Sequence, residues 1–512
     1  MAMDDPAIGD WRKLDSPADL FVEIWRQAST WSPTDRHATP RPEEGILKEL
    51  EAACAQSVGA AALGGILDIV ADQWPAADDY EAKQFRRGLF LAVLEAIDTA
   101  FSAIHPRTPV LRPSTVGRAS APAWLESLAR ERLIRGAYVT MPDQLLIPHG
   151  PLLRTSRGSS ASCGDTLADN FRALTVAPTE GRQAERPIRV RMLVVGEDLA
   201  RGVGRVAAPG AERLIFIPLA ENADELELTE REVHARCFVD VQPTRFDPAQ
   251  RLLDALWAAD VCDLALAPEL TMPEAGFDML ASALAGAATT THRVLLAGSG
   301  LTEGKHEDGR AWNEARLLNG AGAELFRQRK VWPFGMARQR AEDYGLADPG
   351  LDGMVMEDVA AGDELVVADL GGLGRCVVLI CQDIQARPLV DEVVRVFQPD
   401  WVLTPILDGP ITEHGWCRQR AFGLSPAAQT RYVVANSLSL ALRSPAADPA
   451  APPPVGLVVG PLAPAADGDA VPEDLERVTA LAQITPGSSP KFAALTWRDG
   501  SIHWRQITIG SA

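Results

Sequence analysis

The stretch RCVVLICQDIQARP, residues 375–388, decides how this chain is interpreted. Its run of four apolar residues, VVLI at 377–380, is typical of a strand that is covered on both faces of a sheet. Cys381 follows this predicted strand directly. In α/β proteins, ligands and nucleophiles gather at the carboxyl ends of strands, where the chain leaves the sheet. The sequence therefore places Cys381 where a catalytic thiol would stand, although a cysteine taken alone is more often a buried packing residue.

Two further segments have the same plan, an apolar run that ends in a charged residue. In VCDLALAPELTMP, residues 261–273, the run LALA predicts a strand, Pro268 ends it, and Glu269 stands just beyond. In AELFRQRKVWP, residues 323–333, Lys330 follows a short predicted strand. Each residue alone would be interpreted as a solvated surface charge. Together and in order with Cys381, they predict one site.

A glutamate, a lysine and a cysteine in this order, each at a strand end, resemble the nitrilase (carbon–nitrogen hydrolase) superfamily. In MEDVAAGDELVV, residues 356–367, Glu357 resembles the second glutamate of the family, with Glu342 and Glu364 as rivals for that position. Three more stretches resemble family strands and helices on either side of the cysteine: FVDVQPTRFDPAQRLLDALW (238–257), DWVLTP (400–405) and RQRAFGLSPAAQTRYVVAN (418–436). The resemblance covers roughly residues 210–505.

This resemblance implies an α/β fold in which two sheets pack face to face between outer helices, a four-layer α-β-β-α sandwich. We expect it over residues 188–512, with a core at about 210–505. Residues 1–150 are expected to form a mainly helical domain of unknown role, because helical periodicity runs through 45–74, 79–104 and 122–133. Residues 151–187 are rich in Ser, Gly and Arg and predict a linker. GGLG at 371–374 predicts a hairpin turn, because it precedes a strand instead of opening a helix.

Read through the family, the catalytic residues are Glu269, Lys330, Cys381 and Glu357. Glu269 would take the thiol proton, and the thiolate would attack an amide, nitrile or carbamoyl carbon. Lys330 and a backbone N–H near Gln382 would hold the oxyanion, while Glu357 would orient the substrate or the lysine. A thioester would form and then be hydrolysed. This scheme needs no metal and no cofactor, and the sequence has no motif for either.

The substrate-binding residues expected around this centre are Gln382, His414 and Trp416. The last two belong to EHGW, residues 413–416, which we expect to line or cover the pocket. Asp383 is expected to serve a structural hydrogen bond after the nucleophile turn. A papain-like enzyme is disfavoured, because His292 and His414 sit in no recognisable motif beside the cysteine.

The sequence departs from the family pattern in two places. The run QDIQARP after Cys381 lacks the Trp-Glu of true nitrilases, which favours an amide or carbamoyl substrate over a nitrile. It also differs from the run in common small-acid amidases. Between Lys330 and Glu357, the stretch MARQRAEDYGLADPGLDG, residues 336–353, is longer than expected, and such an insertion would reshape the pocket entrance.

Composition excludes several other classes. A chain of 512 residues exceeds one usual hydrophobic core, so two domains are expected. Its net charge of −20 argues against nonspecific nucleic-acid binding, which needs cations to neutralise phosphates. The seven cysteines show neither CxxC pairs nor zinc spacing, which favours reduced thiols and a cytoplasmic protein. No secretory signal or membrane span is expected, because the most apolar long stretch, 52–71, contains Gln, Ser and Asp.

Three functions remain open. The first is a cysteine-dependent hydrolase of a nonpeptide carbon–nitrogen bond in a small amide-type molecule. The second is a catalytically reduced nitrilase-fold protein that senses a ligand or binds a partner. The third is a glutaminase-like subunit that passes ammonia to another enzyme. The resemblance also implies a homodimer or larger assembly, and the N-terminal region is a candidate for binding a protein partner.

Overall fold

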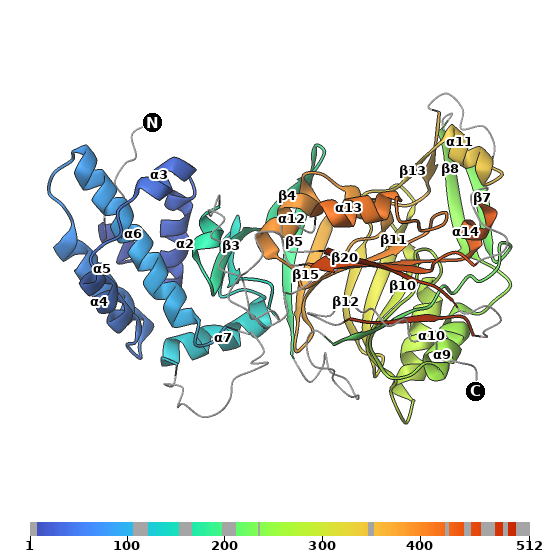
Figure 1. The fold of residues 1–512 in the computed structure, drawn as a ribbon, viewed down its shortest axis with the longest axis horizontal. Coiled ribbons are helices and arrows are strands. Elements are labelled where there is room, and N and C mark those ends of the chain that lie inside the picture. The colour runs from blue at the N-terminus through green and yellow to red at the C-terminus, as the bar shows by residue number, and fades with distance from the viewer. Residues whose placement is uncertain are drawn as a thin grey trace. The chain divides into compact units, whose positions relative to one another are not determined.

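The computed structural model describes residues 8–105, 121–152, 166–196, 211–233, 236–346, 353–424, 430–444, 452–461, 477–484 and 490–497. The chain divides into two compact units, Met1–Thr179 and Glu180–Ala512 (Figure 1). Within the described residues, no helix is long and apolar enough to cross a membrane.

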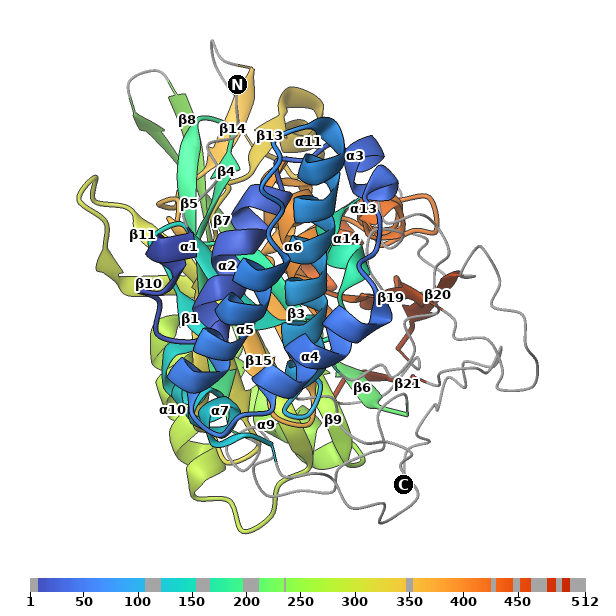
Figure 2. The ribbon, with the colours of Figure 1, turned by 90° about the vertical axis from the view of Figure 1, so that its left-hand side faces the viewer.

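The first unit is mainly helical and ends in a small antiparallel sheet with the order β1-β2-β3. Its elements are α1 (Ile8–Trp11), α2 (Pro17–Ala28), α3 (Pro33–Ala38), α4 (Glu44–Cys54), α5 (Gly59–Gln73), α6 (Tyr80–Phe101), α7 (Ala123–Arg135), β1 (Val139–Thr140), β2 (Gln144–Pro148), the 3-10 helix η1 (Leu167–Asn170) and β3 (Leu174–Pro178). Figure 2 shows α6 beside α2, α4 and α5, and these helices are in mutual contact. The helix expected over 45–74 is two helices, α4 and α5, which are separated at residues 55–58.

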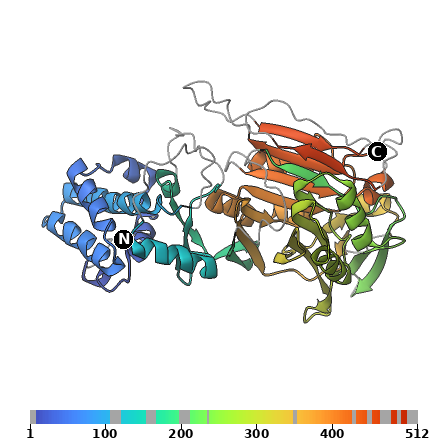
Figure 3. The same cartoon turned by 90° about the horizontal axis from the view of Figure 1, so that it is seen from below.

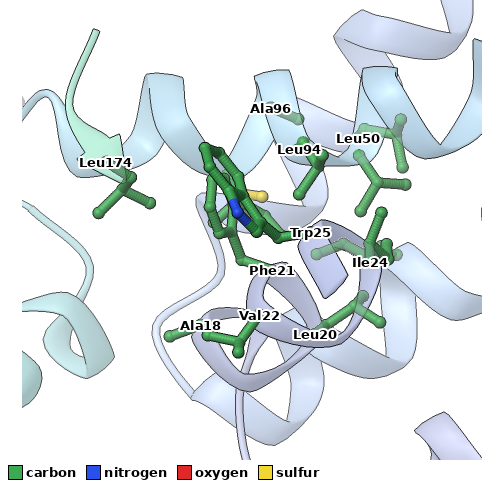
Figure 4. Close-up of a cluster of buried hydrophobic side chains, with 14 of the residues drawn as sticks. Ala18, Leu20, Phe21, Val22, Ile24, Trp25, Leu50, Leu94, Ala96 and Leu174 are labelled. Atoms are coloured by element: carbon green, nitrogen blue, oxygen red, sulfur yellow. The ribbon is translucent and has the colours of Figure 1, made fainter. Parts of the chain in front are cut away.

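The core of this unit joins the helices to the sheet. Side chains of α2, α4 and α6 meet those of β3, as the labelled Phe21, Trp25, Leu94 and Leu174 illustrate (Figure 4). The carboxylate of Asp98 on α6 accepts backbone N–H groups from residues 172–174 at 2.8–2.9 Å. These bonds hold the chain that enters β3 against the helix.

The segment 151–187 is therefore not a simple linker in its described part. Residues 166–178 contain η1 and β3, and the two units divide after Thr179. The composition of residues 151–187 did not reveal this strand, because it is dominated by the Ser- and Gly-rich stretch at 153–165, which lies outside the described residues. Leu174 and Val176 supply the buried face of the strand.

The second unit contains two large sheets and a smaller one. The six-stranded sheet has the order β12-β11-β10-β9-β6-β21, the eight-stranded sheet β20-β19-β18-β17-β16-β15-β5-β4, and the four-stranded sheet β13-β14-β8-β7. The strands of the six-stranded sheet are β6 (Arg213–Phe216), β9 (Cys262–Leu266), β10 (His292–Lys305), β11 (Ala311–Asn319), β12 (Glu324–Arg329) and β21 (Ala493–Thr496).

The eight-stranded sheet contains β4 (Glu180–Gln183), β5 (Arg186–Val195), β15 (Glu364–Leu370), β16 (Gly374–Val378), β17 (Trp401–Ile406), β18 (Arg431–Asn436), β19 (Gly456–Pro461) and β20 (Arg477–Ala482). The four-stranded sheet contains β7 (Leu226–Val233), β8 (Arg236–Pro243), β13 (Gly335–Ala337) and β14 (Met354–Glu357). The remaining elements are α9 (Pro248–Ala258), α10 (Glu274–Ala285), α11 (Arg338–Asp343), the 3-10 helix η2 (Cys381–Gln385), α12 (Leu389–Phe397), α13 (Trp416–Leu424) and α14 (Ser439–Arg443).

The two large sheets contact each other through buried polar side chains. The Gln328 amide on β12 donates to the Glu364 carbonyl and accepts the Val366 N–H, both on β15, at 2.8 Å. The Arg293 guanidinium on β10 donates to the carbonyls of residues 371 and 372, in the turn between β15 and β16. That turn is the hairpin expected from GGLG, with Gly372 at φ 69°. The sheets thus share one interior.

Helices lie outside both sheets. The apolar faces of α9 and α10 pack with residues of β9 and β10 in one buried cluster, and α12 buries its apolar face beside β4. In Figure 1, α12 and α13 lie above β15 and β20, whereas α9 and α10 lie below β10 and β12; Figure 3 gives the view from below. The second unit is therefore a mixed α/β structure with several sheets.

The strand β8 lies in neither of the two large sheets. Residues 238–257 do form a strand followed by a helix, but β8 pairs with β7 and β14 in the four-stranded sheet. The neighbour of β9 in the six-stranded sheet is instead β6. The physical reason lies in the side chains, because β8 alternates buried Val239 and Val241 with more exposed polar residues, whereas β6 is almost wholly buried. A two-faced strand suits a sheet that is covered on one side.

Candidate active site

Cys381 stands at the turn where the chain leaves β16 and enters η2. Its backbone has φ 49°, in the left-handed region that residues with a side chain rarely occupy. Such backbone is held only where the surroundings enforce it, and it is concentrated at functional sites. Leu270, directly after Glu269, has φ 53°. Two of the three strand ends that the sequence singled out thus carry this unusual conformation.

The four predicted catalytic side chains come from four different strand ends and line a single cavity of about 100 Å³. Glu269 follows β9, Lys330 follows β12, Glu357 ends β14 and Cys381 follows β16. All four are buried, with Lys330 only 1% exposed. The fold therefore brings together residues that are as far as 112 positions apart in the sequence.

Hydrogen bonds fix Lys330 between the two glutamates. Its Nζ donates to Glu269 Oε1 at 2.7 Å and also to Glu357 Oε2. Asn313 Nδ2 bridges the same carboxylates, at 2.9 Å to Glu269 Oε1 and 3.0 Å to Glu357 Oε1. The second oxygen of Glu269 accepts the Leu407 N–H at 3.0 Å. Neither carboxylate can turn away without breaking several bonds.

The structure also separates the three candidates for the second glutamate. Glu357 Oε2 accepts the Phe334 N–H at 3.0 Å in addition to its bond with Lys330. Glu364 forms ion pairs with Arg189 and Arg191 instead, and Glu342 is exposed on α11. Of the three, Glu357 lines the cavity.

The electrostatics of this cluster favour proton transfer within it. Burial raises the pKa of Glu269, although attraction to Lys330 opposes the rise. Burial also raises the pKa of the Cys381 thiol, and the negative charge of Glu269 adds to this effect. For Lys330, burial acts against the charged form, but the attraction of Glu269 and Glu357 outweighs it and raises the pKa. The lysine therefore stays charged while the thiol stays protonated.

A thiol of this kind ionises most easily by giving its proton to a neighbour. The Cys381 thiol lies within hydrogen-bonding reach of the Glu269 carboxylate. Loss of the proton to water would add a third negative charge beside two carboxylates and one ammonium, which is costly in a site with little water. Transfer to Glu269 leaves the total charge unchanged. The geometry thus suits a base that acts at the moment of attack.

Asp383 has the structural role that we expected, and its contacts show what it holds. The carboxylate accepts N–H groups from Val331, Trp332 and Ile380 at 2.8–3.3 Å. Burial raises its pKa to about 7. Because Val331 follows Lys330 and Ile380 precedes Cys381, this one side chain ties the lysine and cysteine turns together.

Of the three predicted substrate-binding residues, two line the cavity. Gln382 follows the cysteine, and Trp416 opens α13 and donates its indole N–H to Asp408 at 2.6 Å. His414 is exposed and does not line the cavity. The Thr412–Gly415 turn carries it outward, so that the loop contributes its tryptophan alone.

Sequence reasoning missed three polar residues of the site. Asn313 lies within β11 and had no motif around it. Arg340 and Asp408 both line the cavity and form an ion pair. The lengthened stretch 336–353 gave a signal for Arg340, since an insertion at the entrance was expected there; residues 347–352 of it lie outside the described residues.

The charged side chains of the site balance one another and do not form a metal centre among the described residues. Among the described residues, no group of three or more His, Cys, Asp or Glu side chains is arranged to hold a metal ion. Between Glu269 and Glu357, the cation that balances the carboxylates is Lys330. The described site thus already contains its own positive charge.

The site defines a class, an α/β protein with a buried Glu-Lys-Glu-Cys cluster at converging strand ends. The solved structures that the chain resembles include members of the nitrilase superfamily, the family that the motifs resemble. They include glutamine-dependent NAD+ synthetase from Acinetobacter baumannii (14% identity, TM-score 0.32), with 59% of this chain and 48% of that chain covered. Less than half of the synthetase is therefore matched.

Two others match over most of their own length. Nit3 of Saccharomyces cerevisiae, described as a member of branch 10 of the nitrilase superfamily, is 12% identical, with 55% of this chain and 92% of that chain covered and a TM-score of 0.30. An amidase mutant from Nesterenkonia sp. AN1, with the acetamide moiety of fluoroacetamide added at its active-site cysteine, is 14% identical, with 55% and 94% covered and a TM-score of 0.32. No family model and no curated protein matches the chain. At these values the likeness carries no functional argument, which must come from the site itself.

Proposed function

We propose that this protein is a cysteine-dependent hydrolase of a nonpeptide carbon–nitrogen bond, of amide or carbamoyl type. The observation that supports it most is the convergence of Glu269, Lys330, Glu357 and Cys381 in one buried cavity. A structural cysteine needs neither a carboxylate base nor a buried ammonium beside it. A nucleophilic thiol needs both, one to take its proton and one to stabilise charge.

In the first step, Cys381 Sγ attacks the carbonyl carbon of the substrate. The proton of the thiol passes to Glu269, the C–S bond forms and the carbonyl electron pair moves onto oxygen. Lys330 Nζ and a backbone N–H near Gln382 stabilise this oxyanion. When the tetrahedral intermediate collapses, the C–N bond breaks and Glu269 returns the proton to the leaving nitrogen. The products are ammonia or an amine and a thioester on Cys381.

The second half uses the same groups in reverse order. Glu269 takes a proton from water, the resulting hydroxide attacks the thioester carbonyl, and the C–S bond breaks as the thiol is protonated again. A carboxyl with a raised pKa suits this alternation, because it holds a proton more readily than an ordinary carboxyl does. The proton passes from water to Glu269 while the new C–O bond forms, so the pKa of Glu269 need not match the pKa of water.

The other polar residues position these reacting groups. Glu357 and Asn313 hold Lys330 and Glu269 in register. Asp383 fixes the distance between the lysine turn and the cysteine turn. They are positioning residues in this proposal, since they act through Lys330, Glu269 and Cys381.

The arrangement of the second unit supports the fold that goes with this chemistry. Two facing sheets with α9 and α10 outside one and α12 outside the other would form the four-layer α-β-β-α sandwich. A homodimer or larger assembly, and a protein partner of the first unit, remain proposals that the same resemblance suggests. Sedimentation of the purified protein would test the first of these.

Intact-mass spectrometry tests the function. Wild type, Cys381→Ala and Glu269→Gln are each mixed with a library of primary amides and carbamoyl compounds, quenched with acid and weighed. The expected result is an acyl adduct on wild type that is absent from Cys381→Ala, with ammonia released in amounts far above the protein concentration. Cys417→Ala, which removes another buried thiol near the site, is the matched control and should keep the adduct.

Absence of both adduct and ammonia from the whole library would contradict the proposal. An adduct that persists in Cys381→Ala would contradict the assignment of the nucleophile.

A further inference from the structure

The lining of the cavity combines charged groups with apolar side chains. Its ionic cluster lies beside Cys381, whereas its walls are formed mainly by apolar side chains. The four-stranded sheet supplies part of these walls, through Leu228 on β7, Val239 and Val241 on β8 and Met336 on β13. A group that is bonded to the reacting carbonyl therefore has aliphatic surface to pack against.

The wall is part of a continuous buried cluster and not a set of scattered contacts. Val239 and Val241 are 5% and 7% exposed, and both pack in one cluster with Leu270, which follows Glu269. Their register on β8 sends alternate residues to the cavity side, while Asp240 between them is paired with Gln242 at the surface. The hairpin of β7 and β8 thus presents its apolar face to the site.

The charges in the lining do not leave a cation for an acidic substrate. Lys330 is bonded to Glu269 and Glu357. Arg340 is paired with Asp408 and lies over the Phe334 ring at 5.6 Å. Among the described lining residues these two are the cations, and each is already matched by carboxylate. A substrate carboxylate would therefore have to displace an existing ion pair or be buried without a cation beside it.

The size of the cavity limits the group that fits. An apolar cavity of about 150 Å³ accepts a benzene molecule. The cavity here measures about 100 Å³, so it favours a short acyl group over an aromatic one. Such a group gains about fourfold in transition-state affinity for each methylene that is buried.

We propose, on the basis of the hydrolase function above, that the substrates are amides with a short, neutral, apolar acyl group, and that the β7–β8 hairpin is the wall that selects them. Glutamine is a poor substrate on this view, because its ammonium and carboxylate would be desolvated against Leu228, Val241 and Met336. A preference for apolar amides over glutamine would thus distinguish this protein from a glutaminase-like subunit that uses the same catalytic groups.

Two amides of the same shape give the sharpest test. Isovaleramide and malonamate differ in that two methyl groups of the first are replaced by carboxylate oxygens in the second. For wild type, kcat/KM is expected to be at least about a hundredfold higher for isovaleramide, since an unpaired buried carboxylate is strongly disfavoured. Acetamide, propionamide and butyramide should form a rising series, and glutamine should lie with malonamate.

Variants assign the effect to the hairpin. Val241→Ala widens the wall, so the preference for hydrocinnamamide, which is too large for wild type, should rise at least about tenfold relative to isovaleramide. Val233→Ala, the same deletion on the same hairpin but outside the lining, should leave that ratio unchanged. Asp408→Asn frees Arg340 and should raise malonamate relative to isovaleramide by about tenfold. Each readout is a ratio of kcat/KM for two substrates measured on the same preparation. A smaller fraction of folded protein lowers both values equally and leaves the ratio unchanged.

The outcomes separate this inference from the function on which it rests. Amide hydrolysis that vanishes in Cys381→Ala supports the function whatever the ratios are. Equal or better use of malonamate or glutamine by wild type overturns the apolar specificity. A ratio that Val233→Ala shifts as much as Val241→Ala overturns the role of the hairpin wall, and an unmoved ratio in Asp408→Asn overturns the argument that pairing withholds Arg340 from anions.

Discussion

Replacing Lys330 with methionine should produce a loss of stability that depends on pH. The side chain is 1% exposed and bonds both Glu269 and Glu357, which are 3% and 6% exposed. Methionine has a similar length but no charge, so the variant leaves two buried carboxylates without their cation. Breaking a buried ion pair by removing one partner typically costs about 3–5 kcal/mol of unfolding free energy.

The repulsion between the two carboxylates makes up a large part of this cost. Both accept from Asn313 Nδ2, at 2.9 and 3.0 Å, so the accepting oxygens are no more than about 6 Å apart. Two unit charges at that distance repel each other by about 3 kcal/mol at an effective dielectric constant of about 20. We therefore expect Lys330→Met to lower the unfolding free energy by about 3–5 kcal/mol at pH 8.

The direction of the pH dependence follows from the pKa of Glu269. Burial raises that pKa in the wild type, and attraction to Lys330 lowers it, so removal of the lysine raises it further. A carboxyl whose folded-state pKa lies above its unfolded value contributes stability at low pH and loses it as pH rises through the folded pKa. The variant should thus recover about 2 kcal/mol between pH 8 and pH 5, as one carboxyl takes up a proton.

Urea unfolding of wild type and Lys330→Met at pH 5 and pH 8 measures this difference. Lys305→Met, at an exposed lysine on β10, is the matched control and should change the unfolding free energy by less than about 0.5 kcal/mol at either pH. Glu357→Gln added to Lys330→Met should restore part of the loss at pH 8, because one carboxylate is gone. A variant equally unstable at both pH values, or no less stable than wild type, would refute the charge argument.

Four further outcomes are expected. Asn313→Leu removes the bridge between the two glutamates and should lower kcat about tenfold or more with little change in KM, whereas His414→Ala, on an exposed turn, should leave both unchanged in steady-state assays. Asp383→Ala leaves the N–H groups of Val331, Trp332 and Ile380 without their acceptor, and it should lower the free energy of unfolding in urea by about 2–4 kcal/mol. If the spacing between the two turns is what matters, Asp383→Glu would not restore this stability. Because burial raises the pKa of Cys381, its alkylation by neutral iodoacetamide should accelerate as pH rises above 8, and a flat profile by mass spectrometry would contradict the protonated resting thiol. Negatively charged iodoacetate should label Cys381 at least about tenfold more slowly than iodoacetamide, with exposed model thiols as the reference for intrinsic reactivity.

The sequence predicted the ends of strands well because those signals are local. The apolar runs before Glu269 and Cys381 are each four residues long, and the segment before Lys330 is a short predicted strand; each is close to a strand in the structure. Helical periodicity likewise predicted α6 and α7. Local composition failed where a polar segment preceded a buried strand, as at β3.

Pairing between distant residues was beyond the reach of these patterns. Asn313 lies in the middle of β11 with no distinguishing neighbours, and it became a site residue only when β9, β12 and β14 brought the two glutamates and the lysine around it. The exposed position of His414 and the cavity position of Trp416, two residues later, depend on how one turn closes. No periodicity distinguishes them.

The sequence by itself therefore pointed to the residues of the candidate site, because a carboxylate, an ammonium and a thiol each follow a locally recognisable strand segment. Only the tertiary structure decided which of the three candidate glutamates lines the cavity, which side chains hold it, and what surrounds the cluster. Those properties arise from burial and from charges within a few ångströms of one another. The burial and the short distances both arise between chain segments that meet only after folding.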